Sequence, residues 1–475
     1  MNKISVQQKF IVSDRVLCKI WNLVVMITIL VISGFELHAF SSAMNHRLVT
    51  SSPLLYKQID YTYENLSIEI QPLISGAFDP EHIIANLTPG GKMSLSFDQA
   101  GKADVNPAWL YLQAPLENYT STVTLIPTQQ LYGVLFHCYK QFEHVFFDLK
   151  TSLLKCTNQI AINEFGGGNG VLDNNQGELI YNAYDAFSQN YLQYGKIGTS
   201  NSLIGFDNIQ LFLGASNHVD TMESAHSQTY VAGFAVIEVP TGAGTKSEWL
   251  FEPQVGTNHW GLGFGIDLMF VNDNNFSFVF GGNFRHYIAN WETRTFDLTN
   301  NGAWSRYLLL ESLDSIDTGL QVGTVNFTTQ DALIQGRNQI TMYGRLQKKF
   351  EGCLFELSYN LFYDEAESIN RVTAIPAGYG IYSIQSSGGV TTASQARINE
   401  AEPTGDVTSL VELFTSDLNL ASGAAGQILN NSVAARLQRV EEFYTYGIGA
   451  SVDLAHSVQG ISNWAVWANF EILLP

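Results

Sequence analysis

The feature that most constrains this chain is a strict two-residue alternation of large apolar side chains with small or polar ones. It is clearest between His259 and Phe270, and it returns between Phe276 and Phe284 after the turn-forming residues 271–275. The apolar positions are Trp260, Leu262, Phe264, Ile266 and Leu268 in the first stretch, and Phe276, Phe278, Phe280 and Phe284 in the second. A period of two places the two sets on opposite faces of a β-strand and matches no helix face. The two stretches therefore predict a β-hairpin.

The same alternation recurs along the rest of the chain. It is strong in the segments 208–213, 353–363, 442–454 and 464–474, and weaker in several others. Together these segments predict an all-β chain of about 12–16 strands, which is within the range of outer-membrane barrels. The fold class that we expect is a transmembrane antiparallel up-and-down β-barrel, with long loops that could enter the lumen.

The second face of the strands separates a membrane barrel from its main alternative, a soluble β-sandwich. The solvent-exposed face of a sandwich strand is rich in charged residues. In this chain the polar face of the alternating segments is mostly Gly, Ser, Asn and Thr, and charged residues make up only 14% of the chain. This pattern favours an apolar face toward lipid and a polar face toward a lumen. The candidate lipid-facing residues are Trp260, Leu262, Phe264, Ile266, Phe276, Phe278, Phe280, Tyr359 and Trp464. The candidate lumen-lining residues are Asp267, Asn283, Glu356, Asn360, Asp453 and Glu471.

Composition excludes several other classes of protein. The aromatic content of 12% argues against a disordered chain, and the net charge of −20 argues against a nucleic-acid partner. A mean hydropathy of +0.02 is too low for a transporter of many apolar helices. An alternating barrel averages to such a value, because its apolar and polar residues cancel.

The first 39 residues have the pattern of a secretory signal peptide. Lys3, Lys9, Arg15 and Lys19 precede an uncharged apolar run at 20–35, and small residues follow it. Such a run is short for a spanning helix and suits a signal-peptide core. We expect cleavage after residue 39 and a single barrel domain from 40 to 475; an uncleaved N-terminal anchor is the alternative.

Two segments interrupt the alternation, at 157–204 and 364–439. A short helix is expected within the first, over Tyr181–Tyr194, and a helix within the second, over Val407–Arg439. Loops of this length are unusual unless they are functional, so 364–439 is predicted either to plug the lumen or to form a mobile surface loop. An even number of strands requires a further strand hidden in 364–439 if the tight turn at 349–352 is periplasmic.

The acidic residues among the lumen candidates admit two interpretations. Unpaired, they would create a negative interior that favours cations and neutral solutes over anions. Paired with lumen Arg, Lys or Tyr side chains, they would select nothing. The basic residues available for pairing are Arg285, Arg294, Arg345 and Lys348.

No motif for catalysis, metal binding or a cofactor emerges from the sequence. It contains no HExxH, no P-loop, no GxSxG elbow and no paired CxxC. The glycines at 261, 263 and 265 lie within a strand and are better explained as small lumen-facing residues than as a nucleotide loop. We therefore expect no enzyme activity, no catalytic or metal-ligating residues and no cofactor.

Four stretches between 205 and 263 resemble the loose family of outer-membrane channels around the long-chain fatty-acid transporters and aromatic-hydrocarbon uptake channels. They are Gly205–Leu211, the Pro-Thr-Gly turn at Val239–Gly242, the Pro-x-x-Gly loop at Phe251–Gly256 and Trp260–Gly263. The resemblance implies a porin-like barrel and apolar solutes. Asn106-Pro107-Ala108 is similar to the Asn-Pro-Ala stretch in the N-terminal hatch of the fatty-acid transporters, although the small-residue run expected before it is missing.

These observations predict an outer-membrane channel of a Gram-negative cell envelope for small solutes, with the resemblance favouring hydrophobic ones. The alternative is a plugged structural or adhesion barrel that acts through its surface loops. The expected partners are membrane lipid and lipopolysaccharide, the barrel-assembly machinery and a small-molecule solute, with no nucleic acid. The oligomeric state does not follow from the sequence.

Overall fold

The structure is a computed structural model of the 475-residue chain. The residues that it describes are 50, 52–56, 66–101, 103–112, 118–167, 172–173, 178–198, 200–219, 227–272, 275–315, 321–381, 384–386, 389–391, 396–400, 411–457 and 459–474. The predicted signal peptide lies outside these residues.

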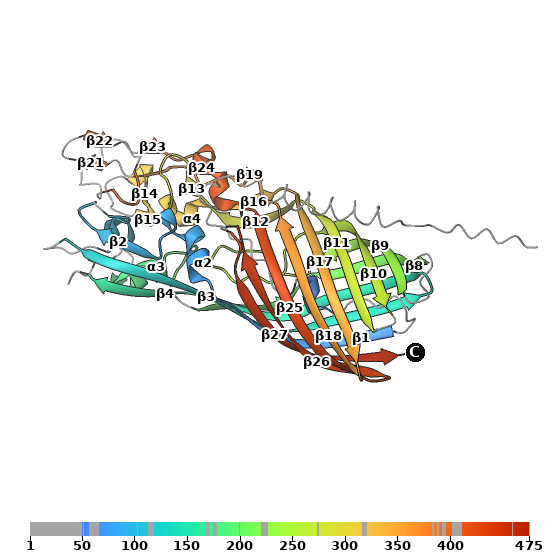
Figure 1. Cartoon of the computed structure of the whole chain (residues 1–475). Helices are drawn as coiled ribbons and strands as arrows, with labels where there is room; N and C mark the ends of the chain where they lie inside the picture. The colour runs from blue at the N-terminus through green and yellow to red at the C-terminus, as the bar shows by residue number, and fades with distance from the viewer. Residues whose placement is uncertain are drawn as a thin grey trace, which may run out of the picture.

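Twelve antiparallel strands close into a β-barrel (Figure 1). In order around the barrel they are β1 (Leu66–Ala77), β3 (Thr120–Phe142), β4 (Val145–Gly166), β8 (Ile209–Val219), β9 (Ser227–Val239), β10 (Gly261–Asn272), β11 (Phe276–Tyr287), β17 (Arg337–Phe350), β18 (Cys353–Asp364), β25 (Ile428–Val440), β26 (Tyr444–Ala455) and β27 (Asn463–Leu474). The barrel closes where β1 pairs with β27, with Leu66 opposite Leu474. The predicted all-β up-and-down barrel is confirmed, and its strand count is within the expected range.

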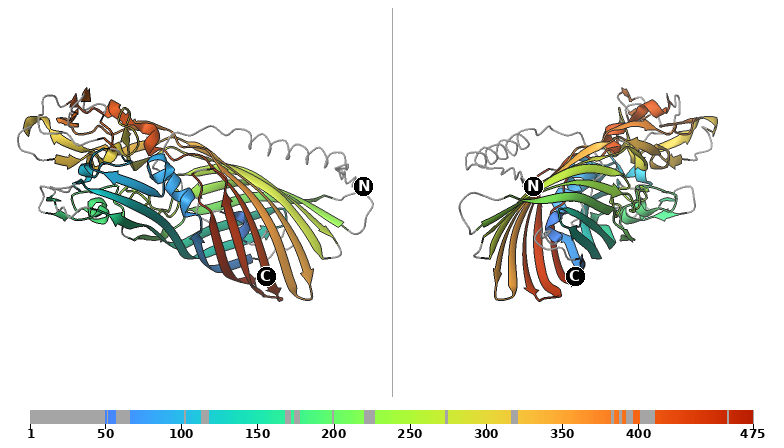
Figure 2. Two further views of the ribbon diagram at one scale, coloured as in Figure 1. Left: turned by 60° about the vertical axis from the view of Figure 1, so that its left-hand side comes forward. Right: turned by 90° about the vertical axis from the view of Figure 1, so that its right-hand side faces the viewer.

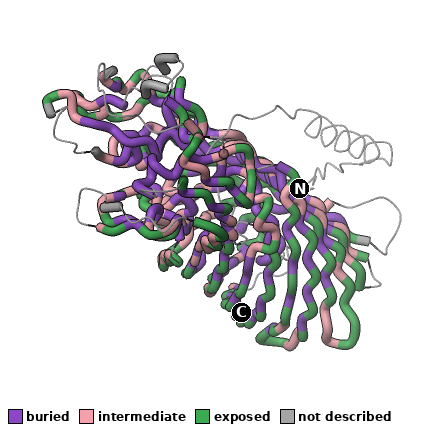
Figure 3. The backbone as a smooth tube through the Cα atoms, turned by 90° about the vertical axis from the view of Figure 1, so that its left-hand side faces the viewer, coloured by how far each residue is buried: buried purple, intermediate pink, exposed green. Residues whose placement is uncertain are grey.

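The alternation in the sequence appears directly as alternating burial along each strand. In β27, Ala465, Trp467 and Glu471 are buried inside the barrel, whereas Val466 and Phe470 are exposed on its outer face. The backbone drawn by burial shows the same repeat along neighbouring strands (Figure 3). The inner positions hold polar residues and a few large aromatic rings, and the outer positions are almost uniformly apolar.

The two ends of the barrel differ in their connections. At one end, where β1 begins and β27 ends, successive strands are joined mostly by tight turns. The turn between β17 and β18 has Glu351 and Gly352 at φ of 40° and 79°, as a two-residue hairpin requires. The tight turn predicted at 349–352 is therefore confirmed, and it lies at the short-turn end.

At the other end, long connections pack together into a second lobe beside the barrel (Figure 2). The lobe and the ends of the long strands include α2 (Pro80–Leu87), β2 (Ser94–Asp98), β5 (Leu172–Asp173), β6 (Leu179–Ile180), α3 (Ala183–Ser188), β7 (Asn201–Phe206), β12 (Asn290–Thr295), β13 (Asp297–Leu298), β14 (Leu309–Ser312), β15 (Gln321–Gly323), α4 (Val325–Thr328), β16 (Thr329–Ile334), β19 (Ile369–Val372), β20 (Tyr379–Ile381), β21 (Ile384–Ser386), β22 (Gly389–Thr391), β23 (Val411–Glu412) and β24 (Leu418–Asn419). A core of its own, which includes Trp109, Phe187, Trp304 and Tyr307, holds the lobe together. Among the described residues, no helix combines the length and the apolarity needed to cross a membrane.

The segment 364–439 differs from its prediction. The helix expected over Val407–Arg439 is wrong, because residues Ile428–Val440 form β25 and pair with both β18 and β26. The Ala, Leu, Arg and Gln residues there are good helix formers, but pairing on both sides overrides that preference. This strand is the hidden one that an even strand count required. The helix expected over Tyr181–Tyr194 is present only as the short α3.

Two of the barrel strands are much longer than the rest. Strands β3 and β4 pair from Phe142 and Val145 at the short-turn end to Ser121 and Gly166 in the lobe. Their outer ends are flanked by β2 and β7, so this hairpin forms one wall of both the barrel and the lobe.

Glycines on the inner face make room for aromatic rings. A Cβ atom at Gly449 would lie 2.4 Å from two ring carbons of the buried Trp467, and one at Gly265 would lie 2.3 Å from the ring of Phe234. At Gly233, which is exposed on the outer face of β9, a Cβ atom would meet no heavy atom within 4 Å. The small residues of the alternating pattern are therefore partly explained by ring packing inside the barrel.

We predict that Gly449→Ala destabilises the folded barrel by about 1–3 kcal/mol, because the added methyl group overlaps the ring of Trp467. The measurement is the urea midpoint of the heat-sensitive gel-mobility shift in detergent. Gly233→Ala is the matched control and should be neutral or slightly stabilising. Equal midpoints for the two variants would contradict the packing.

Candidate functional site in the barrel lumen

The structure places all six predicted lumen residues on the inner face and buries them. Asp267 accepts a hydrogen bond of 2.5 Å from the Tyr343 hydroxyl. Glu356 lies 3.4 Å from Nη1 of Arg345 and accepts a hydrogen bond from Gln347. Glu471 accepts a hydrogen bond of 2.6 Å from Ser67, and Asn283, Asn360 and Asp453 are buried among the strands.

The basic residues expected to pair with these acids are distributed differently. Arg345 does pair with a predicted acid, Glu356, and Arg285 pairs with Glu238 at 2.7 Å. Arg294 lies in the lobe on β12, and Lys348 lies at an outward position of β17. The contacts that the structure gives for Asp267 and Glu356 correspond to the paired interpretation of the acids, whereas the contact given for Glu471 is with a serine.

The nine candidate lipid-facing residues lie on the outer face of the barrel. Eight are exposed, from 36% for Phe278 to 65% for Phe264, and Phe280 is half-buried. Comparable apolar side chains surround them on every neighbouring strand. That they face lipid is a proposal to which we return below.

A short N-terminal segment lies inside the barrel, and sequence reasoning did not identify it. Residues Pro53–Leu55 form one turn of 3-10 helix, with Ser52 Oγ accepting a hydrogen bond from the Leu54 amide. Leu54 and Leu55 are fully buried in the same apolar cluster as Tyr139, Tyr343 and Trp467, which line the inner wall. We call residues 52–56 the plug segment.

Two arginines of the barrel wall hold the main chain of the plug segment. Arg345 donates to the carbonyl of Tyr56 at 2.7 Å and to that of Pro53. Arg436 donates to the carbonyl of Leu54 at 3.3 Å and to that of Leu55. Four consecutive carbonyl groups are therefore bound by two guanidinium groups.

The two arginines are themselves held in position. The guanidinium of Arg345 lies 5.6 Å from the ring centre of Tyr343, and that of Arg436 lies 5.9 Å from that of Trp467. A guanidinium group at this distance is attracted to the face of an aromatic ring. Glu356 and Glu69 supply the opposing charges, with Glu69 Oε1 3.8 Å from Arg436 Nη1.

Tyr56 ends the plug segment within a group of charged and aromatic side chains. Lys150 Nζ lies 5.3 Å from the centre of its ring, and the His137 ring meets it edge-on at 5.7 Å. His137 in turn bridges Asp148, at 2.7 Å, and Glu69, at 3.4 Å. The plug segment is thus connected to the polar network of the lumen at both its main chain and its last side chain.

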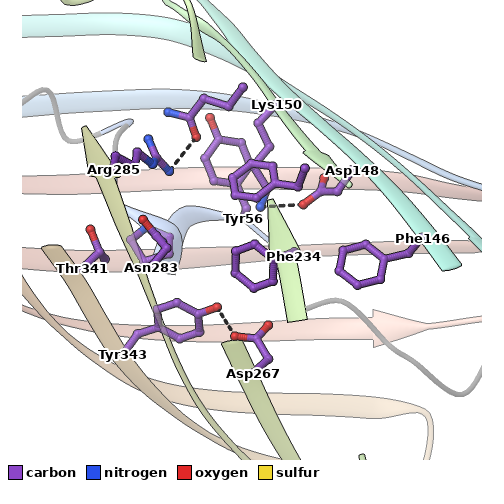
Figure 4. A pocket seen from close by; sticks show the side chains of 13 residues that line it. Tyr56, Phe146, Asp148, Lys150, Phe234, Asp267, Asn283, Arg285, Thr341 and Tyr343 are labelled. Carbon is purple, nitrogen blue, oxygen red and sulfur yellow. Dashed lines mark hydrogen bonds and ion pairs between the residues drawn. The ribbon is translucent and has the colours of Figure 1, made fainter. Parts of the chain in front are cut away.

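A cavity of about 40 Å³ lies beside Tyr56 (Figure 4). Its lining includes Phe146, Phe234, Asp267, Asn283 and Arg285, which come from four strands. A space of this size holds a few water molecules at most. With the plug segment in place, the cavity beside Tyr56 is therefore too small for any solute larger than water or a small ion.

A second buried charge cluster joins the lobe to the barrel mouth. Glu292 lies 2.6 Å from Arg294 and 3.3 Å from His259. Glu367 pairs with Arg294 at 3.1 Å and with Arg337, the first residue of β17. Although burial opposes it, the positive charge of Arg294 and the contact with His259 lower the pKa of Glu292 below its ordinary value. Nothing in the local sequence indicated this cluster, because its members come from four separate segments.

Among the described residues, no group of three or more His, Cys, Asp or Glu side chains is arranged to hold a metal ion. The Asn106-Pro107-Ala108 stretch lies in the lobe, where Pro107–Leu110 is a short 3-10 helix whose Trp109 joins the lobe core. The stretch therefore does not form a hatch inside the barrel.

The three comparisons with known proteins give only distant likenesses. No family model matches the chain, and no curated protein matches it. The COG4313 outer membrane channel from Pseudomonas putida F1 aligns over 88% of this chain and 100% of its own, with 8% identity and a TM-score of 0.38. The translocator domain of the autotransporter NalP from Neisseria meningitidis aligns over 87% and 90%, with 9% identity and a TM-score of 0.30. The toluene transporter TodX from Pseudomonas putida aligns over 92% and 98%, with 7% identity and a TM-score of 0.22.

Likenesses this weak carry no argument about function. The barrel is established by its own strand pairing, which closes from β1 to β27. The class of protein that the fold and site define is a closed, twelve-stranded β-barrel whose lumen holds a segment of its own chain.

The carboxyl group of Glu252, in the connection between β9 and β10, makes the stability of this loop dependent on pH. Burial raises the pKa of Glu252 to about 7, with repulsion from Glu248 in the same direction. Its Oε2 accepts hydrogen bonds from the amides of Lys246 and Ser247, at 3.0 and 2.7 Å. A carboxyl with a raised pKa stabilises the folded loop most below its ordinary pKa, and that stabilisation is lost as pH rises through about 7.

We predict that this loop opens more readily at high pH. Trypsin cleavage after Lys246 should be severalfold faster in the native chain than in Glu252→Gln at pH 8.5, and equal at pH 5.5. Taking the ratio of the two chains removes the pH dependence of trypsin itself. A ratio that does not change with pH would mean that burial of Glu252 does not control the loop.

Proposed function

We propose that this protein is an outer-membrane β-barrel channel for small solutes, closed at rest by its own plug segment. The observation that carries the proposal is the plug segment itself, held inside the lumen through main-chain carbonyls by Arg345 and Arg436. The leucine side chains of the segment pack against the inner wall, and its main chain accepts hydrogen bonds from charged groups. A solute that presents carbonyl oxygens can accept the same hydrogen bonds.

The outer face of the barrel supports placement in a membrane. On β3 the outward residues from Phe142 to Tyr132 are apolar except for Lys140, which lies near the short-turn end. Beyond Tyr132 they are mostly polar: Gln130, Thr128, Thr124 and Thr122, with Ile126 among them. The apolar stretch matches the roughly 9–11 residues that a tilted strand needs to cross a bilayer. A soluble protein rarely exposes so large an apolar area. The short turns then face the periplasm, and the lobe faces outward toward lipopolysaccharide.

Membrane placement predicts a depth-dependent cost for charge on the outer face. Ile266→Arg, in the middle of the apolar band, should destabilise the barrel in phospholipid vesicles by about 2–4 kcal/mol. Thr128→Arg, on the outer face of β3 beyond the band, should have little effect. The folded fraction is measured by heat-dependent gel mobility after refolding into vesicles. Equal losses for both variants would overturn the placement.

The second candidate function is a plugged structural or adhesion barrel that acts through its lobe. The size of the lobe and its own apolar core favour this candidate. The two functions differ in the conductance that is expected once the plug segment is removed, because only a channel has a continuous path through the lumen.

We predict that freeing the lumen turns a closed barrel into a conducting one. Residues 50–56 are replaced by an equal length of Gly and Ser in the mature chain, which keeps the chain length before β1 unchanged. In planar bilayers the native chain should show rare or no conductance steps, and the replaced chain should show stable steps. A Gly and Ser replacement of the same length at residues 385–391, in the β21–β22 region, is the control and should leave the barrel closed.

Each outcome of this experiment decides between the functions. Steps in the replaced chain alone support a channel closed by the plug segment. Silence of both chains supports the structural or adhesion barrel. Equal steps in both chains would show that the plug segment does not close the lumen.

A further inference from the structure

We propose that the seat of the plug segment is itself a solute-binding site, specific for small uncharged molecules that carry several carbonyl groups, such as short neutral peptides. In this proposal, which rests on the proposed channel function, the plug segment and the solute compete for the same site. The seat comprises Arg345, Arg436 and the apolar wall against Leu54 and Leu55.

The polar half of the seat recognises carbonyl oxygens. A guanidinium group offers five donors in a fixed planar fork. Arg345 and Arg436 use theirs on the four carbonyls of residues 53–56. Both arginines are at least 97% buried, and among the described residues the Nε atom of each has no hydrogen-bond partner. The Nε–H groups of the two arginines can therefore donate hydrogen bonds to a ligand whose acceptor atoms lie at other positions than those of the plug segment.

The apolar half of the seat selects aliphatic side chains. Leu54 and Leu55 are 1% and 0% exposed, within the inner-wall cluster of Tyr139, Tyr343 and Trp467. Burying two leucine side chains contributes several kcal/mol to binding in either an intramolecular or an intermolecular ligand. A ligand therefore needs apolar groups on one side and carbonyl groups on the other, which is the chemistry of a short peptide.

The charges around the seat favour a neutral ligand over an anionic one. Arg345 is already faced by Glu356, and Arg436 by Glu69. Glu471 lies opposite Glu69 in the pairing of β1 with β27 and accepts a hydrogen bond from Ser67. A ligand carboxylate would add negative charge to a buried site whose positive charges are already balanced, and that has a high desolvation cost. An uncharged carbonyl oxygen avoids this cost.

The seat is prepared before a ligand arrives. The rings of Tyr343 and Trp467 lie against the two guanidinium groups, and the strands β17 and β25 that carry the arginines are both neighbours of β18. Preorganised donors lose little entropy on binding. A tethered competitor acts at an effective concentration in the millimolar range, so an external ligand binds the native chain much more weakly than a chain without the segment.

The test uses the chain in which residues 50–56 are replaced by Gly and Ser, refolded in detergent. The probe is acetyl-Pro-Leu-Leu-Tyr-amide, the sequence of residues 53–56, with a fluorescent label at its carboxyl end, and the readout is fluorescence anisotropy. We expect saturable binding to the replaced chain and binding at least about tenfold weaker to the native chain. In the replaced chain, Arg345→Gln with Arg436→Gln should weaken binding by at least about tenfold.

Matched controls keep this test decisive. Arg439 lies on β25, as Arg436 does, but its side chain is exposed and pairs with Glu441. The Arg439→Gln variant should therefore bind the probe normally. Arg345→Lys keeps the charge and loses the fork, so it should bind severalfold more weakly even if the double variant fails to fold. Folding of every variant is checked by its heat-dependent gel mobility.

Binding is measured without conduction, so the two proposals fail separately. A replaced chain that conducts but does not bind the probe overturns this inference and leaves the channel intact. A replaced chain that binds the probe but never conducts overturns the channel and leaves the site as one that accepts such peptides. Displacement of the probe by butanoate, with no displacement by the unlabelled peptide, would show that the seat takes carboxylates and would overturn the specificity.

Discussion

The pairing of β1 with β27 is the constraint on which the rest of this molecule depends. Closure leaves no free strand edge in the barrel, and a bilayer tolerates strands only under that condition. Once the sheet is closed, the two faces of every strand have opposite requirements. The outer face must be apolar at its exposed positions such as Phe264 and Val466, and each charge on the inner face needs a partner. The pairing of Glu356 with Arg345 and of Asp267 with Tyr343 follows from that need.

Much of the barrel could be predicted because alternation is a local signal. A single stretch of ten residues around Phe264 is enough to assign an inner and an outer face, and the structure places the candidate residues accordingly. The plug segment has no such signal, because its seat is built by Arg345 and Arg436, which are 292 and 381 positions away from their partners Pro53 and Leu55 in the sequence. The strand β25 was hidden for a related reason: its helix-forming residues become a strand only through pairing with β18 and β26.

The lobe illustrates the same limit on a larger scale. The sequence indicated that the connections would be long, and it contained no sign that they would share a core. Their contacts join distant segments, as when Trp304 Nε1 donates to the Leu87 carbonyl at 2.7 Å and Trp109 Nε1 to that of Glu400 at 3.2 Å. Each connection alone buries too little apolar surface to stay ordered, whereas six of them together form a domain-like core.

The position of the plug segment also bears on the order in which the chain assembles. Leu66 and Leu474 meet at the closing seam, so the two ends of the barrel sequence must both be present before the sheet can close. Contacts between such distant residues form late, because the loop between them is costly to order. The plug segment precedes β1 by only a few residues, and it is therefore brought to the lumen by the same late step. Until the seam forms, the arginine seat is open along one side and accessible to water. Closure of the barrel wall and insertion of the plug segment therefore occur in the same step.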